Sequence, residues 1–451
     1  MSEMRDLEVR FDRACSLLFG ELLPEESLAV DFSGEASHFL RFNSGRVRQI
    51  GAVLQAGARF TYYRNGRTIS SAFEVSGDER LDAERAEEAL ATARREAPLL
   101  PEDPYQVLPS ASGRSSEEFS GRLPDPSFLP HEVLGPGEAV TRAGADYVGI
   151  HSQGAVCRGA ANSLGARHWF ATETFCVDYS AWLPNGKAVK SAYAGREWDP
   201  AEYARRIAAA RPRLEALSKP EKVIPPGDYR VYIAPDALNE FIPFFSWNGL
   251  GERCMREGES AWLALREGRR STSPRFRLSQ DFGLGAEPRF NEFGEVAPAT
   301  LVLVEDGRLA ATVVSSRSAR QYGVASNAAP EEERVRSPAI DGGSLDEGKA
   351  IEEIGEGLYL SNLHYLNWSD NDSGRITGMT RYACFWVQDG KIAAPIRDMR
   401  FDESIYHLFG DKLLDASRQR LLVPDTGTYM LRSVGGALLP GLLVRDFTFT
   451  L

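Results

Sequence analysis

The sequence predicts an α+β protein, in which an N-terminal domain of helices and an antiparallel meander is followed by a mainly β C-terminal domain. Three observations support this fold class. Helical and strand-like periodicity alternate over the first hundred residues, X-Gly turns recur between strand-like segments in both halves, and a proline-rich linker at residues 219–227 separates the halves. The chain has 451 residues, which is enough for two or three domains.

Residues 1–97 form the first predicted region, which begins and ends with a helix. Apolar residues recur at helical spacing over residues 4–23 and again over residues 79–96, which predicts two amphipathic helices. Two of the turns between them carry Asn-Ser-Gly and Arg-Asn-Gly, and asparagine and glycine tolerate the positive φ of a tight hairpin turn. Four short strands are expected in this meander, at residues 27–33, 38–43, 46–55 and 58–63.

Residues 98–130 contain seven prolines among serine and acidic residues, and we expect them to form a long irregular connection. Residues 131–222 are the second part of the N-terminal domain. Strands return there over residues 147–193, and residues 168–179 are rich in aromatic and β-branched side chains. A helix is predicted to begin at Asp199-Pro200, because proline is favoured at the first helical position.

Residues 227–451 form the predicted C-terminal domain, which is mostly β. Hairpins are expected around Asp306-Gly307, with a second strand over residues 308–315, and around Asp389-Gly390. Residues 326–344 are expected to form a polar loop. The alternation of residues 442–451 predicts a final strand paired within the sheet.

The start of the C-terminal domain is a suitable place for a metal site. A strand at residues 229–233 leads through Asp236, a candidate helix N-cap, into an apolar segment that continues to Phe245. A zinc hydrolase would place two histidines and a glutamate on one helical face here, because residues three and four apart are neighbours. No histidine lies between His168 and His364, so the segment lacks the ligands for that chemistry.

Composition argues against several classes of function. The net charge of −12 disfavours nucleic acid or an anionic membrane surface as the main partner. No apolar run is long enough to span a bilayer, and the first residues have no apolar segment typical of a signal peptide. The five scattered cysteines include no Cys-x-x-Cys pair and fit reduced thiols. We therefore expect a cytoplasmic protein with no nucleic-acid or membrane partner.

Several motifs carry weak signals for chemistry. The pair His131-Glu132 begins like a zinc-peptidase motif, but a Gly-Pro pair stands where the second histidine belongs. The glycine-rich stretch between His151 and His168 is interpreted as a turn between strands, with a ligand loop as the alternative. Residues 368–374 resemble part of a calcium-binding loop but lack its final glutamate, which favours a polar turn. The four glutamates within residues 240–259 are expected to lie on a solvated helix face.

Short stretches spread over nearly the whole chain carry a resemblance to a known family. They are RFNSGRVRQI at residues 41–50, GDYRVYIAPD at 227–236, SARQYGV at 318–324, ERVRSPAI at 333–340, GLYLSNL at 357–363 and SGRITGMTRYACFWVQDGKIAAPI at 373–396. No single stretch is diagnostic. In their order and spacing they resemble the TldD/PmbA (TldE) family, a two-domain group of metallopeptidases and their relatives.

The resemblance also implies what this chain has lost. Peptidases of the family bind zinc through H-E-x-x-x-H on the helix and a cysteine near the C-terminus. Here residues 242–247 are apolar and aromatic where the histidines belong, Pro243 lies among them, and no cysteine follows Cys384. The resemblance therefore implies the PmbA/TldE-like branch: a non-catalytic subunit with no metal or cofactor of its own, with zinc expected only in a TldD-like catalytic partner.

The same resemblance suggests partners and a site. It implies a heterodimer with a TldD-like catalytic subunit, or a homodimer, acting on an unfolded peptide substrate. The substrate-binding residues expected are Trp247 and Asn248 at the former helix, Asn327 in the polar loop, and Arg375; no catalytic or metal-binding residue is predicted. Two alternatives stay open. One is a hydrolase active on its own, which would need a cleft holding two or more carboxyl groups with raised pKa. The other is a stand-alone peptide-binding homodimer.

Overall fold

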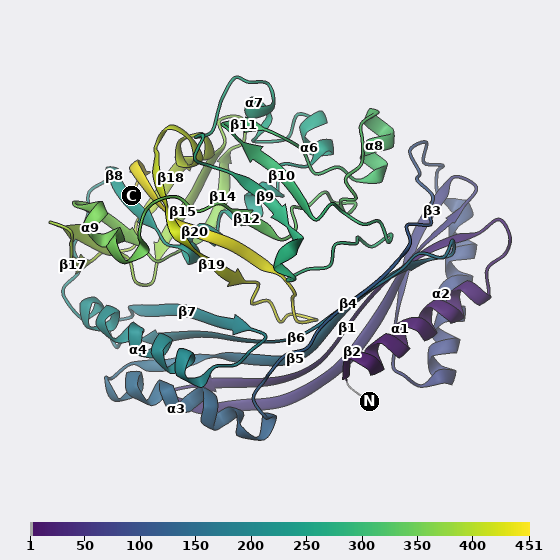
Figure 1. Ribbon diagram of the computed structural model, residues 1–451, viewed down its shortest axis with the longest axis horizontal. Coiled ribbons are helices and arrows are strands. Elements are labelled where there is room, and N and C mark those ends of the chain that lie inside the picture. The colour runs from purple at the N-terminus through teal and green to yellow at the C-terminus, as the bar shows by residue number, and fades with distance from the viewer. Residues whose placement is uncertain (1–2) are drawn as a thin grey trace.

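Residues 3–451, which the computed structural model describes, form two β-sheets, one from each half of the chain (Figure 1). The first sheet has seven strands in the order β3-β2-β1-β5-β6-β4, with β7 also paired to β6. The second sheet has thirteen strands, β8 to β20. The predicted α+β class, with a β-rich C-terminal part, is confirmed. We call the part that contains the first sheet the N-terminal unit and the part that contains the second sheet the C-terminal unit.

The strands of the first sheet are much longer than predicted. Residues 27–33 and 38–43 belong to one strand, β1, which pairs without interruption with both of its neighbours through Gly34. Gly34 makes no turn. A Cβ atom at Gly34 would lie 2.9 Å from Leu7 Cδ2 and 3.1 Å from Cys157 Sγ, so the glycine lets a helix approach the sheet closely. Residues 46–55 and 58–63 likewise form one strand. The strands of this sheet are β1 Ser27–Asn43, β2 Arg46–Arg64, β3 Arg67–Glu74, β4 Arg114–Phe119, β5 Asp146–Asn162, β6 Arg167–Trp182 and β7 Ala188–Gly195.

Four helices cover the outer face of the first sheet at its two ends (Figure 1). Each end has its own apolar cluster: Phe11 stacks on Trp169 in one, and the buried Tyr147 and Tyr203 share a hydrogen bond in the other. The long strands pass through both clusters, and this accounts for their length. The helices are α1 Glu3–Gly20 and α2 Glu79–Glu96 at one end, and α3 Leu129–Arg142 and α4 Pro200–Leu217 at the other.

The segment that follows α2 differs most from the sequence prediction. Residues 98–130, expected to be irregular throughout, contain β4, which pairs in parallel with β6, and the 3-10 turns η1 Ala97–Leu99 and η2 Pro126–Phe128. Helix α3, which contains Pro136, was not predicted from the sequence. Its residues Leu129, Val133 and Val140 are buried in the second apolar cluster. Tertiary packing here outweighs the low helix propensity of glycine and proline.

The second sheet is organised around β8 Gly227–Ile233, which lies parallel to β13 and antiparallel to β20. The hairpins at Asp306-Gly307 and Asp389-Gly390 are confirmed, although the second strand of the first hairpin is only β11 Arg308–Leu309. The other strands are β9 Leu278–Asp281, β10 Thr300–Glu305, β12 Pro338–Ile340, β13 Gly357–Leu360, β14 Asn362–Asp370, β15 Arg375–Arg381, β16 Phe385–Gln388, β17 Lys391–Pro395, β18 Arg400–Ser404, β19 Leu413–Pro424 and β20 Gly436–Phe449.

The helices of the C-terminal unit are all short. They are α5 Pro235–Asn239, α6 Glu252–Arg256, α7 Leu263–Arg266, α8 Ser316–Tyr322 and α9 Ala350–Ile354, together with the turns η3 Ile242–Phe245, η4 Phe282–Leu284, η5 Glu347–Lys349 and η6 His407–Asp411. Across residues 3–451, no helix combines the length and the apolar character needed to cross a membrane.

The core of the C-terminal unit gives a direct test of the packing. Phe245 is buried against the rings of Trp262, Phe276 and Phe409. We expect Phe245→Ala to lower the free energy of unfolding by about 3–5 kcal/mol, because it removes buried apolar surface and leaves a cavity. Phe128 is 61% exposed, so Phe128→Ala should change it by less than about 0.5 kcal/mol. Urea unfolding of both variants measures the difference, and equal losses would contradict this packing.

Candidate functional site

The helix that follows β8 ends after five residues. α5 spans Pro235–Asn239, and its N-cap is Ala234 rather than Asp236, because Pro235 already occupies the first helical position. The chain then forms the 3-10 turn η3, with Pro243 near its start. Proline has no amide hydrogen to donate within a helix, so one continuous helix from Asp236 to Phe245 does not form.

The residues present in this segment do not fit a zinc ion. Phe244 and Phe245 are buried, and the hydroxyl of Ser246 accepts the amide hydrogen of Val335. Within residues 3–451, no group of three or more His, Cys, Asp or Glu side chains is arranged to hold a metal ion. A zinc site requires such a group, so residues 3–451 do not supply one.

A cleft runs along the loops of the C-terminal unit, and two of its three cavities also lie against the first sheet. One cavity, of about 330 Å³, lies beside α5 and η3 and is lined by Asn239, Ile242 and Pro243. A second, of about 530 Å³, is mainly charged, and a third, of about 290 Å³, lies against α8. Neighbouring cavities share lining residues, and we call them together the cleft. The shared residues are Glu287, Arg334 and Val434 between the first two, and Thr61, Ser70, Phe293 and Glu331 between the second and the third.

The inner wall of the cleft is a polar sheet face. Along β1, polar residues alternate with the apolar residues that pack under the helices, so the polar ones face the C-terminal unit. The sequence prediction divided β1 into two short strands, so this continuous polar face was not predicted. The period-two alternation itself was the available signal. The polar residues are Asp31, Ser33, Glu35 and Ser37.

Two carboxyl groups line the charged cavity from opposite walls. Asp31 stands on β1 opposite Arg59 of β2, and no described residue gives its carboxylate a hydrogen bond or an ion pair. Burial raises the pKa of Asp31 to about 6, against the opposing effect of Arg158 and Arg59. Glu292 accepts the amide hydrogen of Glu331 at 2.7 Å, and burial raises its pKa to about 7.

The remaining charges of that cavity are mostly engaged. Arg334 forms ion pairs with Glu287 and Glu332. Arg336 is buried and donates hydrogen bonds to backbone carbonyls, including that of Phe290 at 2.8 Å. Burial lowers the pKa of Arg336 to about 10, against the opposing effect of the nearby carboxylates, chiefly that of Glu287.

A second buried arginine crosses from the C-terminal unit to the first sheet. Arg432 lies in the loop between β19 and β20. Its Nη2 donates to the carbonyl oxygen of Gly154 at 2.5 Å, and its Nη1 donates to that of Thr174 at 2.9 Å. Its own amide hydrogen is donated to the Glu35 carboxylate at 3.3 Å. The loop therefore forms a wall of the cleft that is fixed to both units.

The four substrate-binding residues predicted from the sequence do not line the cleft cavities. Trp247 is half exposed, and its carbonyl oxygen accepts a hydrogen bond from the indole of Trp368. Asn248 has a left-handed backbone, with φ 47°. The side chain of Asn327 links the backbone of Val314 and Thr312. A role for these residues in substrate binding stays a prediction.

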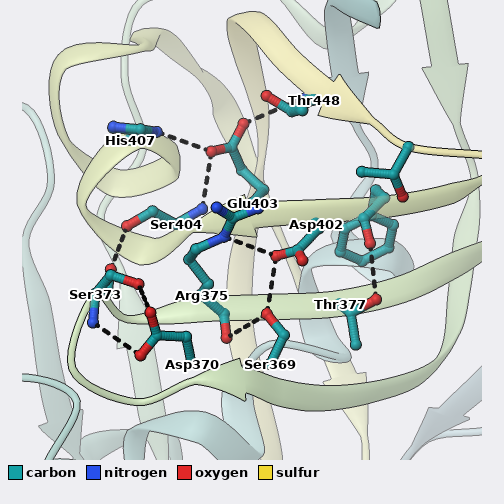
Figure 2. A network of polar contacts seen from close by, with 12 residues as sticks. Ser369, Asp370, Ser373, Arg375, Thr377, Asp402, Glu403, Ser404, His407 and Thr448 are labelled. Atoms are coloured by element: carbon teal, nitrogen blue, oxygen red, sulfur yellow. Dashed lines mark hydrogen bonds and ion pairs between the residues drawn. The ribbon is translucent and has the colours of Figure 1, made fainter. Parts of the chain in front are cut away.

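Arg375, the fourth predicted residue, belongs to a polar network at the turn between β14 and β15 (Figure 2). Its Nε donates to Asp402 at 3.1 Å, and Asp370 of the same turn accepts the hydroxyl hydrogen of Ser373 at 2.5 Å. In β18, which pairs with β15, the buried Glu403 binds His407 and Lys412, each at 3.0 Å. The stretch that resembles a calcium loop is therefore a polar turn, held by its own side chains.

Two further interpretations of the sequence were wrong. The glycine-rich stretch between His151 and His168 is neither a turn nor a ligand loop, because it runs through the middle of β5 with β1 and β6 paired on either side. Glu252 is not solvated. It is 3% exposed and accepts hydrogen bonds from Arg256, Arg266 and Thr312.

The raised pKa of Asp31 predicts a pH-dependent effect on stability. The folded protein holds this proton more tightly than the unfolded chain, so stability falls as the pH rises from the usual pKa of 3.8 to about 6. Asp31→Asn removes that loss. We expect the variant to be more stable than the wild type by about 1–2 kcal/mol at about pH 8, and equal to it at about pH 4. Urea unfolding at both pH values, with the exposed Glu88→Gln as the control, measures this difference, and a gain of the same size at both would contradict it.

Comparisons with known proteins agree with this architecture. A family model described as the PmbA/TldA metallopeptidase C-terminal domain matches residues 226–451. TldE from Thermococcus kodakarensis aligns over 99% of this chain and 100% of its own, with a TM-score of 0.75 and 15% identity. A putative modulator of a DNA gyrase from Thermotoga maritima aligns over 98% of this chain and 100% of its own, with a TM-score of 0.73 and 15% identity. A similarly described protein from Bacteroides thetaiotaomicron aligns over 99% of this chain and 98% of its own, with a TM-score of 0.73 and 14% identity. No curated protein matches the sequence.

Proposed function

The chain belongs to the TldD/PmbA family of metallopeptidase-related proteins, and from this we propose that it is a non-catalytic, TldE-like subunit. In this proposal it assembles with a TldD-like zinc peptidase in the cytoplasm for the proteolysis of unfolded peptides. The observation that carries the proposal is the segment after β8. The strand is kept at the centre of its sheet, whereas the helix ends after five residues and offers no metal ligands.

The cleft supports a role in holding an extended chain. It runs from α8 past the charged cavity to α5, and its walls are a polar sheet face and irregular loops. Extended peptides bind such surfaces largely through backbone hydrogen bonds, which depend little on sequence. In the proposed complex this chain supplies a wall for the peptide, and the partner supplies zinc and the hydrolytic step.

Assembly and zinc content test the proposal together. The chain is purified alone and after co-expression with a family member that carries H-E-x-x-x-H. We expect the chain alone to hold no zinc and to cleave no unstructured peptide, and the mixture to form a one-to-one complex that holds zinc and cleaves it. Light scattering measures the complex, mass spectrometry measures zinc, and chromatography measures the products.

A partner in which the glutamate of H-E-x-x-x-H is replaced by glutamine is the control, and it should assemble without cleaving. Zinc-dependent cleavage by the chain alone would refute the proposal. A homodimer that binds peptide but does not bind the partner would favour the stand-alone alternative.

One observation favours a second candidate, a hydrolase that acts on its own. Asp31 and Glu292 line one cavity and both have a raised pKa, about 6 and about 7. In this candidate the Asp31 carboxylate takes a proton from the attacking water, and the Glu292 carboxyl protonates the leaving amine. Among residues 3–451, no hydrogen bond joins the two groups or orients Asp31, so the geometry supports this candidate less well than it supports the subunit.

The second candidate predicts cleavage by the chain alone that persists in a chelator. The rate should rise with pH through about 6 and fall above about 7, following the two pKa values. Asp31→Asn and Glu292→Gln should each lower kcat by at least about a hundredfold. A peptide assay across this pH range checks the expectation, and the absence of any product at every pH would exclude the candidate.

A further inference from the structure

A small cavity, separate from the charged one, lies where Arg432 meets the first sheet. We call it the Arg432 pocket. It has a volume of about 160 Å³ and is lined by Thr172, Arg196, Leu284, Leu422, Arg432 and Val434. It shares Pro424, Asp425, Thr426 and Val434 with the cavity beside α5. The pocket is therefore a side branch of the cleft, next to the segment where the peptidase helix is missing.

The guanidinium of Arg432 is only partly satisfied. The residue is 4% exposed, and its two Nη atoms donate to carbonyl oxygens of the first sheet. Its Nε has no hydrogen-bond partner among the described residues, and no carboxylate oxygen of those residues lies within 4.0 Å of the guanidinium. A buried charge without an ion-pair partner is costly, and burial lowers the pKa of Arg432 to about 10, against the opposing effect of the Glu35 carboxylate.

Thr172 supplies a second unsatisfied polar group in the same pocket. It is 3% exposed on β6, and its hydroxyl has no hydrogen-bond partner in the described part of the chain. Buried hydroxyl groups are normally paired. Thr172 and Arg432 come from different units and line one cavity, which therefore brings together two buried polar groups that lack hydrogen-bond partners among the described residues.

The other charges of the pocket favour an anion. The guanidinium of Arg196 lies 4.7 Å from the ring centroid of Phe119, and no carboxylate among residues 3–451 pairs with it. The one acidic residue in the lining, Asp425, already accepts the amide hydrogen of Gly427 at 2.9 Å. Two arginines therefore face one carboxylate, which leaves the lining of the pocket with a net positive charge.

We propose that the Arg432 pocket binds a carboxylate carried on a small apolar group, and that its occupant is the C-terminal carboxylate of a bound peptide. The oxygens accept hydrogen bonds from Arg432 Nε and the Thr172 hydroxyl, and Leu284, Leu422 and Val434 contact the last side chain. The proposal rests on the proposed function, because it names the part of the peptide that this subunit holds. An aspartate or glutamate side chain carries the same chemical group, and the experiment separates the two sources.

Binding of small probes to the full chain tests the pocket without the partner subunit. N-acetylalanine is compared with N-acetylalaninamide, which has the same shape and no charge, by titration calorimetry or ligand-observed NMR. We expect the acid to bind at least about tenfold more tightly than the amide, because a charge-assisted hydrogen bond is lost in the amide. Equal binding, or no binding of either probe, would overturn the proposal.

Thr172 offers a matched pair of variants. Thr172→Val removes a hydroxyl that has no partner in the free protein, so folding should be unaffected while the preference for the acid falls by about tenfold. Thr172→Ser retains the hydroxyl and should keep the preference. An unchanged preference in Thr172→Val would remove Thr172 from the site.

Three peptides of one sequence decide between the two sources of carboxylate. The first has a free C-terminus, the second is amidated, and the third is amidated and carries an internal glutamate. Only the first should bind with the affinity gain seen for N-acetylalanine. A gain with the third would assign the pocket to acidic side chains and overturn the C-terminal assignment. Complex formation with the TldD-like partner is scored separately, so loss of assembly with retained acid selectivity would refute the proposed function and not the pocket.

Discussion

Arg432 makes hydrogen bonds that join the two units beside the cleft. Its guanidinium donates to the carbonyl oxygens of Gly154 and Thr174, which face each other on β5 and β6. Gly154 has φ 130°, and a Cβ atom there would lie 2.1 Å from the carbonyl oxygen of Ala36, so the sheet requires glycine at this contact. The loop between β19 and β20 is thereby fixed to the first sheet, and the walls of the cleft follow from that attachment.

The same attachment explains why the inner face of the first sheet is polar and yet covered. Glu35 is 2% exposed, and its carboxylate accepts hydrogen bonds from Ser37, Gln55 and the amide of Arg432. At the other end of the cleft, Asp103 and Arg317 of α8 form an ion pair at 3.1 Å. Hydrogen bonds and ion pairs of this kind fix orientation more than they add stability. Polar contacts line the cleft, whereas apolar contacts join the two units where Phe385 belongs to the same buried cluster as Tyr179.

Sequence periodicity identified α1, α2, β8 and the hairpins, because each is a local pattern of apolar residues and turns. It failed at Gly34 and at Pro136, where a close helix contact and burial in a cluster decide the structure, and neither is local. The missing metal ligands after β8 could be read directly from residue types. Asp31 and Glu292 could not be brought together in this way, since they come from different units and share a cavity only in the folded chain. Arg432 lies in a glycine-containing loop, and nothing in the sequence around it predicts that it is buried.

The central position of β8 has a consequence for how the protein is made. Its two neighbours are β13 and β20, and Ile233 pairs with Leu442 from the far end of the C-terminal unit. During synthesis on the ribosome, all strands of the first sheet have been made well before β20 emerges. Until then β8 lacks its pairing with β20, and its apolar residues Val231 and Ile233 are not yet buried. Pairings between such distant segments form slowly, and until they form, unpaired strand edges that promote aggregation stay exposed. The nascent chain should therefore be a client for chaperones mainly while its C-terminal unit is being translated.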